Sequence, residues 1–203
     1  MIKRTSKSHI DKILSENEEW NILDIGCGFN AHQYASTICD ILDLKEYYSD
    51  RKFVKLDGEK LPFNDKEFDF VIASHVLEHV QNPTNFLKEI SRVAKQGYIE
   101  VPTKLEDNLV FENKKAHLWQ LTFDDINHII NITKKIQYFE PILTVSTVKK
   151  LHNYFRDSLV IELHWQDSIE FKLTENANLV DNFSNINLLK KYFSKKLRML
   201  FKK

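Results

Sequence analysis

Two glycines spaced one residue apart are the first chemical feature of this chain, which contains only four glycines. Gly26 and Gly28 follow the apolar run 22–25, which carries one acid, Asp24. A buried strand that ends in a turn without side chains lets the backbone come close to a ligand. Taken alone, this pair fits an ordinary strand-exit turn equally well.

Acids and small polar residues follow three further apolar runs. Ligands of open α/β sheets bind outside the carboxyl ends of the strands, so these residues are expected to meet at one edge. A carboxylate after the second run suits ribose hydroxyls, and one after the third suits the adenine amine. The residues at these ends, in chain order, are Asp43, Asp57, Gly58, Glu59, Ser74 and His75. Together they predict a nucleoside pocket.

The elements that position these residues alternate between strands and helices. We expect strands over 20–25, 38–44, 53–56, 68–74 and 98–101, and helices over 6–19 and 85–95, the latter begun by Pro83 and ended by Gly97. This alternation predicts a mostly parallel sheet with flanking helices. Residues 103–126 are expected to be irregular, and 126–133 to form a strand. Two antiparallel strands, 159–163 and 168–173, are expected around a turn at 164–167.

Four segments in order resemble the class I S-adenosylmethionine-dependent methyltransferases of the type 11 group. They are ILDIGCG (22–28), FVKLDGEKLPFNDKEFDF (53–70), IASHVLEHV (72–80) and RVAKQGYIEVP (92–102). The resemblance covers roughly residues 20–120. It implies an α/β, Rossmann-like fold, S-adenosyl-L-methionine as cofactor, and methyl transfer to an acceptor.

The resemblance also implies roles for individual residues. The turn Gly26-Cys27-Gly28 would pass under the methionine part of the cofactor, and Asp24 would order this loop or bind the amino group. Asp43 would hold the ribose. The remaining positions would meet the adenine or close the site near the sulfonium: Asp57, Gly58 and Glu59 for the former, Ser74 and His75 for the latter.

The chain departs from the family pattern after the first glycine motif. Asn30 stands where a third glycine is expected, and too few residues follow for the usual long helix. A subset of these enzymes has a similar short loop that leads directly to the ribose acid. Asp40 is therefore an alternative to Asp43, which we favour because it follows the apolar pair 41–42.

Two competing motifs are less consistent with the sequence. His75, Glu78 and His79 match the H-x-x-E-H pattern of one zinc protease class, but they follow directly on an expected strand, so no metal site is predicted. Glu78 and His79 are expected to cap or pack their segment. A nicotinamide site needs G-x-G-x-x-G opening a helix, and no long helix follows here.

His75 and His117 are the candidate catalytic residues. Transfer to an oxygen acceptor needs a base, which a histidine can supply, whereas a nitrogen acceptor needs none. His117 lies in the sequence His117-Leu118-Trp119, which is also consistent with a packed aromatic turn. The sequence does not identify the acceptor, which we expect to be a small molecule, a saccharide or a lipid-linked species. A non-catalytic cofactor-binding interaction module is the alternative.

The charge is divided unevenly between the two parts of the chain. Residues 1–181 hold 22 of the 29 basic residues and all 29 acidic ones, a net charge of −7, whereas residues 182–203 carry +7. We predict a methyltransferase-like domain over 1–181 and a basic amphipathic helix over 182–203, with Leu189, Tyr192, Phe193, Lys196 and Leu200 on one face. This helix suits peripheral membrane contact through 184–203 or packing on the domain or a second subunit. The acidic body disfavours nucleic acid.

The composition of the chain indicates in which cellular compartment the protein is expected. The chain has no apolar run near the ~20 residues that span a bilayer. The N-terminus lacks the apolar stretch of a signal peptide. Two cysteines, Cys27 and Cys39, cannot form a disulfide framework and suit a reducing compartment. We therefore expect a cytoplasmic protein, with or without peripheral contact with a membrane.

Overall fold

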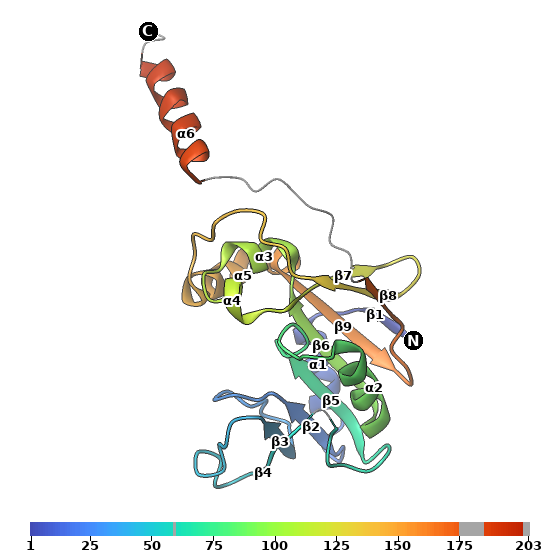
Figure 1. Ribbon diagram of the computed structural model, residues 1–203. Helices are drawn as coiled ribbons and strands as arrows, with labels where there is room; N and C mark the ends of the chain where they lie inside the picture. Colours follow the sequence, from blue (N-terminus) through green and yellow to red (C-terminus); the bar gives the residue numbers. More distant parts are fainter. Residues whose placement is uncertain (59, 175–184, 201–203) are drawn as a thin grey trace.

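A mostly parallel sheet forms the centre of the computed structural model, which describes residues 1–58, 60–174 and 185–200 (Figure 1). Its strands, in spatial order, are β1 (Ile2–Arg4), β9 (Val160–Gln166), β6 (Ala94–Pro102), β5 (Phe68–Ser74), β2 (Ile22–Ile25), β3 (Thr37–Asp40) and β4 (Lys52–Lys55). Neighbours from β6 to β4 are parallel, whereas β9 is antiparallel to both β6 and β1. The predicted fold class is confirmed.

Helices cover both faces of this sheet because its central strands are apolar on both sides. α1 (Lys7–Ser15) begins at Ser6, whose side chain accepts the His9 amide, and α2 (Pro83–Val93) begins at Asn82, which caps Asn85. One buried cluster joins α1 to the sheet through Ile10, Leu14, Ile22, Ile38 and Phe70. Another joins α2 to the opposite face through Leu87, Ile90, Val93, Leu23 and Val71. Successive strand residues supply the two clusters, as the pleat requires.

Gly97 lies inside β6 and does not end the preceding helix, so this expectation was wrong. A Cβ added there would lie 2.5 Å from the Val71 carbonyl oxygen and 2.9 Å from Trp165 Nε1. The glycine is required by close packing in the centre of the sheet, and it carries no information about the end of α2.

The described residues after β6 contain more helices and strands than the sequence predicted. Residues 103–126, expected to be irregular, contain α3 (Lys104–Leu109), α4 (Asn113–Ala116) and β7 (Trp119–Asp124). β7 pairs antiparallel with β8 (Ile129–Lys134), which pairs parallel with β10 (Phe171–Thr174). α5 (Val145–Leu159) leads into β9. Residues 164–166 lie within β9, so the expected turn at 164–167 begins too early, and β9 and β10 belong to different sheets.

α6 (Asn185–Leu200) occupies most of the basic segment, as predicted. The described part of its apolar face consists of exposed side chains, Ile186, Leu189, Tyr192, Phe193 and Leu197. The side chain of Leu200, which was expected on this face, lies outside the described residues. Among the described helices, none has the length and apolar character needed to cross a membrane.

Candidate active site at the carboxyl edge of the sheet

The glycine turn after β2 leaves open space at the carboxyl edge of the sheet. Gly26 and Gly28 have φ values of +68° and +50°, in the left-handed region that favours glycine. A Cβ on Gly26 would lie 2.5 Å from Val76 Cγ2, whereas a Cβ on Gly28 would meet nothing within 4 Å. The first glycine is required by packing, and the second leaves its backbone accessible to a ligand.

Asp24 orders the short loop that replaces the family's helix. Its Oδ2 accepts the His32 amide at 2.7 Å, and Arg51 donates to the His32 carbonyl at 3.0 Å. Tyr48 closes the loop, because its hydroxyl donates to the Gly28 carbonyl at 2.9 Å. Burial raises the pKa of Asp24 to about 6, although the His32 amide opposes this shift.

Cys27 is a buried neutral thiol in the same turn. Burial, together with the charges of Asp24 and Asp40, raises its pKa to about 12. Since the thiolate is the nucleophilic form of cysteine, this thiol is unreactive at neutral pH. Cys39 of β3, whose carbonyl accepts the Cys27 amide at 3.3 Å, is also buried and has its pKa raised mainly by burial.

Asp40, rather than Asp43, lies at the carboxyl end of β3. Its Oδ2 accepts the Gly28 amide at 2.8 Å and its Oδ1 accepts the Leu42 amide at 2.9 Å. β3 ends at Asp40, so the expected extension of the strand to residue 44 was wrong. Asp43 is exposed, and within the described residues its carboxylate accepts the Lys45 amide at 3.3 Å. The carboxylate beside the glycine turn is therefore Asp40.

The acid-glycine segment lies next to this carboxylate. The Leu56 amide donates to the Asp40 carbonyl at 2.8 Å, which holds the residues after β4 beside the end of β3. Asp57 follows, with an 86% exposed side chain, and Gly58 has open space on its Cβ side. Glu59 lies outside the described residues.

His75 follows Ser74 at the end of β5 and is held between two carboxylates. Its Nε2 lies 3.0 Å from Glu100 Oε1 and its Nδ1 lies 3.2 Å from Glu78 Oε1. Burial lowers the pKa of this imidazole, but the hydrogen bonds to Glu100 and Glu78 outweigh it and raise the pKa to about 10. A protonated imidazole has no lone pair with which to act as a base.

Glu100 connects His75 to the rest of the sheet. Arg156 of α5 lies 2.6 Å from Glu100 Oε2 and 3.0 Å from Glu162 Oε1, and the Tyr98 hydroxyl lies within hydrogen-bond distance of both carboxylates. Burial raises the pKa of Glu100, but the hydrogen bond and charge of His75 lower it to about 2. This network fixes the position of the His75 ring, whose backbone has a left-handed φ of +56°.

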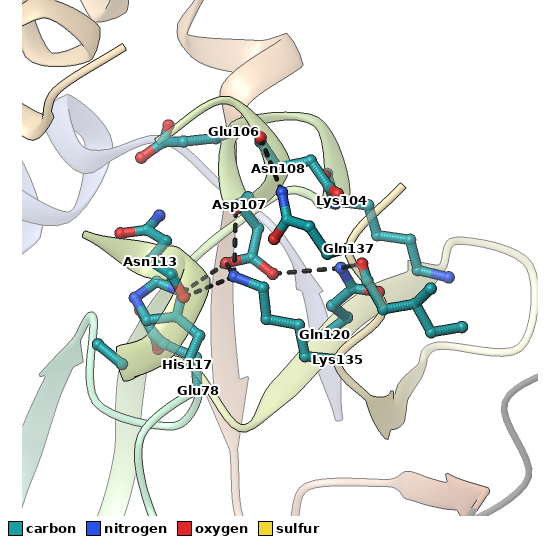
Figure 2. Close-up of polar contacts among 12 residues, drawn as sticks. Glu78, Lys104, Glu106, Asp107, Asn108, Asn113, His117, Gln120, Lys135 and Gln137 are labelled. Carbon is teal, nitrogen blue, oxygen red and sulfur yellow. Dashed lines mark hydrogen bonds and ion pairs between the residues drawn. The ribbon is translucent and has the colours of Figure 1, made fainter. Parts of the chain in front are cut away.

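A second polar group surrounds His117, which follows α4. Its Nδ1 lies 2.6 Å from Asp107 Oδ1, and Lys135 Nζ lies 2.9 Å from the same oxygen (Figure 2). Gln120 donates to Asp107 Oδ2 at 3.3 Å. Asp107 and His117 are buried, so this is a preformed carboxylate–imidazole pair. Asp107, Gln120 and Lys135 were not predicted, because their partners lie ten or more residues away along the chain.

His117 also lines a cavity of about 440 Å³. The other lining residues are Gln81, Lys114, Leu118, Trp119, Lys134, Lys135 and Gln137. Two amide and three ammonium side chains line this surface together with the apolar Leu118 and the aromatic ring of Trp119. The cavity therefore combines hydrogen-bonding groups with an apolar and aromatic surface.

Comparison with known proteins assigns a family to the first half of the chain. Residues 23–99 match the family model described as "Methyltransferase domain". Residues 23–99 belong to this methyltransferase family. The resemblance inferred from the sequence motifs is thereby confirmed for the segment that carries the glycine turn, Asp40, Asp57 and His75.

Individual relatives match over part of their length. The sterol 4-C-methyltransferase strm-1 of Caenorhabditis elegans is 32% identical over 112 residues, which cover 44% of this chain and 32% of that protein. The uncharacterized protein MJ0638 of Methanocaldococcus jannaschii is 33% identical over 109 residues, covering 50% and 48%. The chain thus spans less than half the length of these relatives. An S-adenosylmethionine-dependent methyltransferase structure from Mesorhizobium loti is 12% identical, covers 78% of this chain and 96% of that chain, and has a TM-score of 0.45.

Proposed function

We propose that this protein transfers a methyl group from S-adenosyl-L-methionine to a polar acceptor. The observation that carries the proposal is the Asp40 carboxylate, which binds the Gly28 amide at the carboxyl edge of a methyltransferase-family segment. The activity of the sterol methyltransferase relative points to the same reaction class. The open space at Gly28 and Gly58 fits a ligand that the backbone approaches closely.

The chain's own residues suit the parts of this cofactor. Asp40 would accept hydrogen bonds from the ribose hydroxyls, a role that we assign to it in preference to Asp43. Exposed Ile41 and Leu42 follow Asp40 and offer apolar surface for the adenine, and Asp57 with Gly58 would bind its edge. The turn from Gly26 to Gly28, ordered by Asp24, would support the methionine part.

The cofactor supplies a methyl group already activated by a sulfonium leaving group. The protein then contributes mainly alignment and proximity. Ser74 and His75 close this edge of the sheet, and protonated His75, paired with Glu100 and Glu78, acts there as a positioning residue. His117 faces the acceptor cavity through Nε2, since its Nδ1 binds Asp107. That lone pair can accept a proton from an acceptor hydroxyl.

The lining of the cavity supports our proposal for the acceptor class. Amide and ammonium groups beside Trp119 suit a hydroxyl-rich molecule such as a saccharide, free or linked to a lipid. We place the protein in the cytoplasm, with its two buried free thiols, and at a membrane surface through α6. Nucleic acid remains a disfavoured acceptor because residues 1–181 are acidic.

Calorimetry with S-adenosylhomocysteine tests the cofactor site. We expect the wild type to bind, and Asp40→Ala to bind about 10–100-fold more weakly, because hydrogen bonds to a charged group contribute roughly 1.5–3 kcal/mol. Asp43→Ala is the matched control and should bind like the wild type. Circular dichroism checks that each variant is folded.

Three outcomes would contradict parts of this proposal. If the folded wild type does not bind S-adenosylhomocysteine, the proposed enzymatic activity is contradicted and an interaction protein becomes the favoured alternative. Weaker binding by Asp43→Ala together with unchanged binding by Asp40→Ala would return the ribose role to Asp43. Binding without transfer to a broad acceptor panel would support the alternative of a non-catalytic cofactor-binding module.

A further inference from the structure

Three side chains with metal-ligating atoms meet beside the acceptor cavity. Glu78, His79 and His117 each bring one such atom, and these atoms all lie within 4.8 Å of one another. Glu78 and His79 lie in the turn after β5, whereas His117 follows α4. The Leu118 amide donates to the Glu78 carbonyl at 2.8 Å, which fixes the two segments side by side.

Hydrogen bonds determine which nitrogen of each histidine is available. His79 Nδ1 lies 3.0 Å from the Ala116 carbonyl oxygen, which can only accept, so Nδ1 carries the proton and Nε2 keeps its lone pair. His117 Nδ1 lies 2.6 Å from Asp107 in the same way. The two rings are perpendicular, with centroids 4.5 Å apart. In both histidines Nδ1 is therefore the hydrogen-bonded nitrogen and Nε2 is available to a metal. Metal-bound histidines commonly donate a hydrogen bond from the nitrogen that does not bind the metal.

The Glu78 carboxylate gives independent evidence for a bound cation, because one of its oxygens is buried without a hydrogen bond within the described residues. Its side chain has 0% exposure, and its Oε1 contacts His75 Nδ1 at 3.2 Å. Its Oε2 is buried and has no hydrogen-bond partner within the described residues. An unsatisfied buried carboxylate oxygen is costly, and a cation would remove that cost.

We propose that Glu78, His79 and His117 bind one divalent transition-metal ion. Two imidazoles and a carboxylate suit Zn²⁺ and its neighbours such as Co²⁺ and Mn²⁺. Ligands about 2.1 Å from one ion lie at most about 4.2 Å apart, a separation that atoms within 4.8 Å of one another can reach with at most a small side-chain shift. Asp107, held by Lys135, anchors His117 and provides the carboxylate behind a metal-bound histidine.

The ion would have coordination positions left for water or an acceptor oxygen. This consequence rests on the proposed methyl transfer, whereas the metal site itself does not. His117 would then bind the ion through the lone pair otherwise available for a proton. An acceptor hydroxyl bound to the ion would lose its proton more readily, as metal-bound water does.

Titration of the full-length, untagged and chelator-treated protein with Co²⁺, without cofactor, tests the site. Visible absorption and calorimetry should report one ion per chain. Glu78→Gln, His79→Gln and His117→Gln should each weaken Co²⁺ binding by at least about 100-fold, and Asp107→Asn by about 10–100-fold. His9→Gln, which changes an exposed histidine of α1, should bind like the wild type. Because His79 is also exposed, His79→Gln is expected to fold normally and is the decisive variant.

Co²⁺ binding tests the metal site, and S-adenosylhomocysteine binding tests the proposed function, so the two proposals can be contradicted separately. Wild-type protein that binds no Co²⁺, or folded His79→Gln that binds it as tightly as the wild type, would overturn the metal site. Co²⁺ binding that is lost in the ligand variants would support the site even where S-adenosylhomocysteine does not bind. The opposite pattern, in which S-adenosylhomocysteine binds and Co²⁺ does not, would support the proposed function and contradict the metal site.

Discussion

At the scale of single residues, Asp24 makes the free energy of unfolding depend on pH. Its pKa is about 6 in the folded protein against 3.8 for an ordinary aspartate, so the folded state binds a proton more tightly. The charged carboxylate therefore destabilises the fold above pH 6, and this cost falls as the pH drops towards 4. A buried acid with this behaviour is expected where a site keeps a charge for a ligand.

Asp24→Asn should remove this dependence. The amide oxygen can still accept the His32 amide, and the buried charge is lost, so the variant should be more stable than the wild type at pH 7.5, by up to about 3 kcal/mol. The difference should shrink towards zero by pH 4. Urea unfolding at several pH values measures it, with Asp43→Asn as the exposed control. A constant difference across this range would contradict the assignment.

The expected end of the strand at residue 44, which favoured Asp43 over Asp40, shows where residue-level prediction failed. Ile41 and Leu42 were read as buried strand residues, which placed the ribose acid after them. They are 73% and 52% exposed, so the strand ends before them. An exposed apolar pair cannot be distinguished from a buried one by periodicity, and a ligand-binding edge is where such pairs are expected. The motifs around Gly26, Asp57 and His75 were predictable because they are local in sequence.

At the scale of elements, α2 holds the loop that follows the acid-glycine segment. Arg92 donates to the carbonyls of Leu61 and Phe63 at 3.0 and 2.8 Å and lies 2.8 Å from Asp65. Glu89 orients the guanidinium and accepts the Leu61 amide at 2.8 Å. The Arg92 side chain thus satisfies two backbone carbonyls of this loop, whose described residues 60–67 form no strand.

Arg92→Met should release this loop while retaining most of the apolar stem. Two carbonyls and an acid lose a charged donor in a part-buried setting, so we expect a loss of about 2–3 kcal/mol in the free energy of unfolding. Hydrogen exchange should become faster over residues 58–66. Lys88→Met, at an exposed position of the same helix, is the control. Unchanged exchange in the arginine variant would show that other contacts hold the loop.

Strands and helices were predicted accurately where the local pattern of apolar residues alone identifies the element. The apolar run of β5 was placed at its observed bounds, since a strand buried on both faces is continuously apolar. α3, α4 and β7 were missed because their polar residues, such as Asp107 and Gln120, are buried through partners distant in sequence. The His117 cluster depends on these elements, so only His117 itself could be predicted.

At the scale of the whole molecule, the chain combines an acidic body with a basic helix. In α6, Ile186, Leu189, Phe193 and Leu197 follow helical spacing on one face, and each is more than half exposed. Lys191, Lys195 and Arg198 lie on the opposite side by the same spacing. This arrangement is typical of helices that lie in the interface of an anionic bilayer. The boundary that we propose at residue 181 would separate this helix from the methyltransferase-like domain.

Co-sedimentation with vesicles tests membrane contact by the full-length protein. Binding to vesicles rich in phosphatidylserine should exceed binding to phosphatidylcholine vesicles, because each basic residue near an anionic surface contributes about 1 kcal/mol. Replacing Lys191 and Lys195 by Gln should therefore weaken binding roughly thirtyfold. Phe193→Ser with Leu197→Ser should weaken it on both vesicle types, since the apolar face is changed and the charge is not. Lys88→Met, outside α6, should bind like the wild type. Equal sedimentation of the wild type and both tail variants would assign α6 to packing on the domain or on a second subunit.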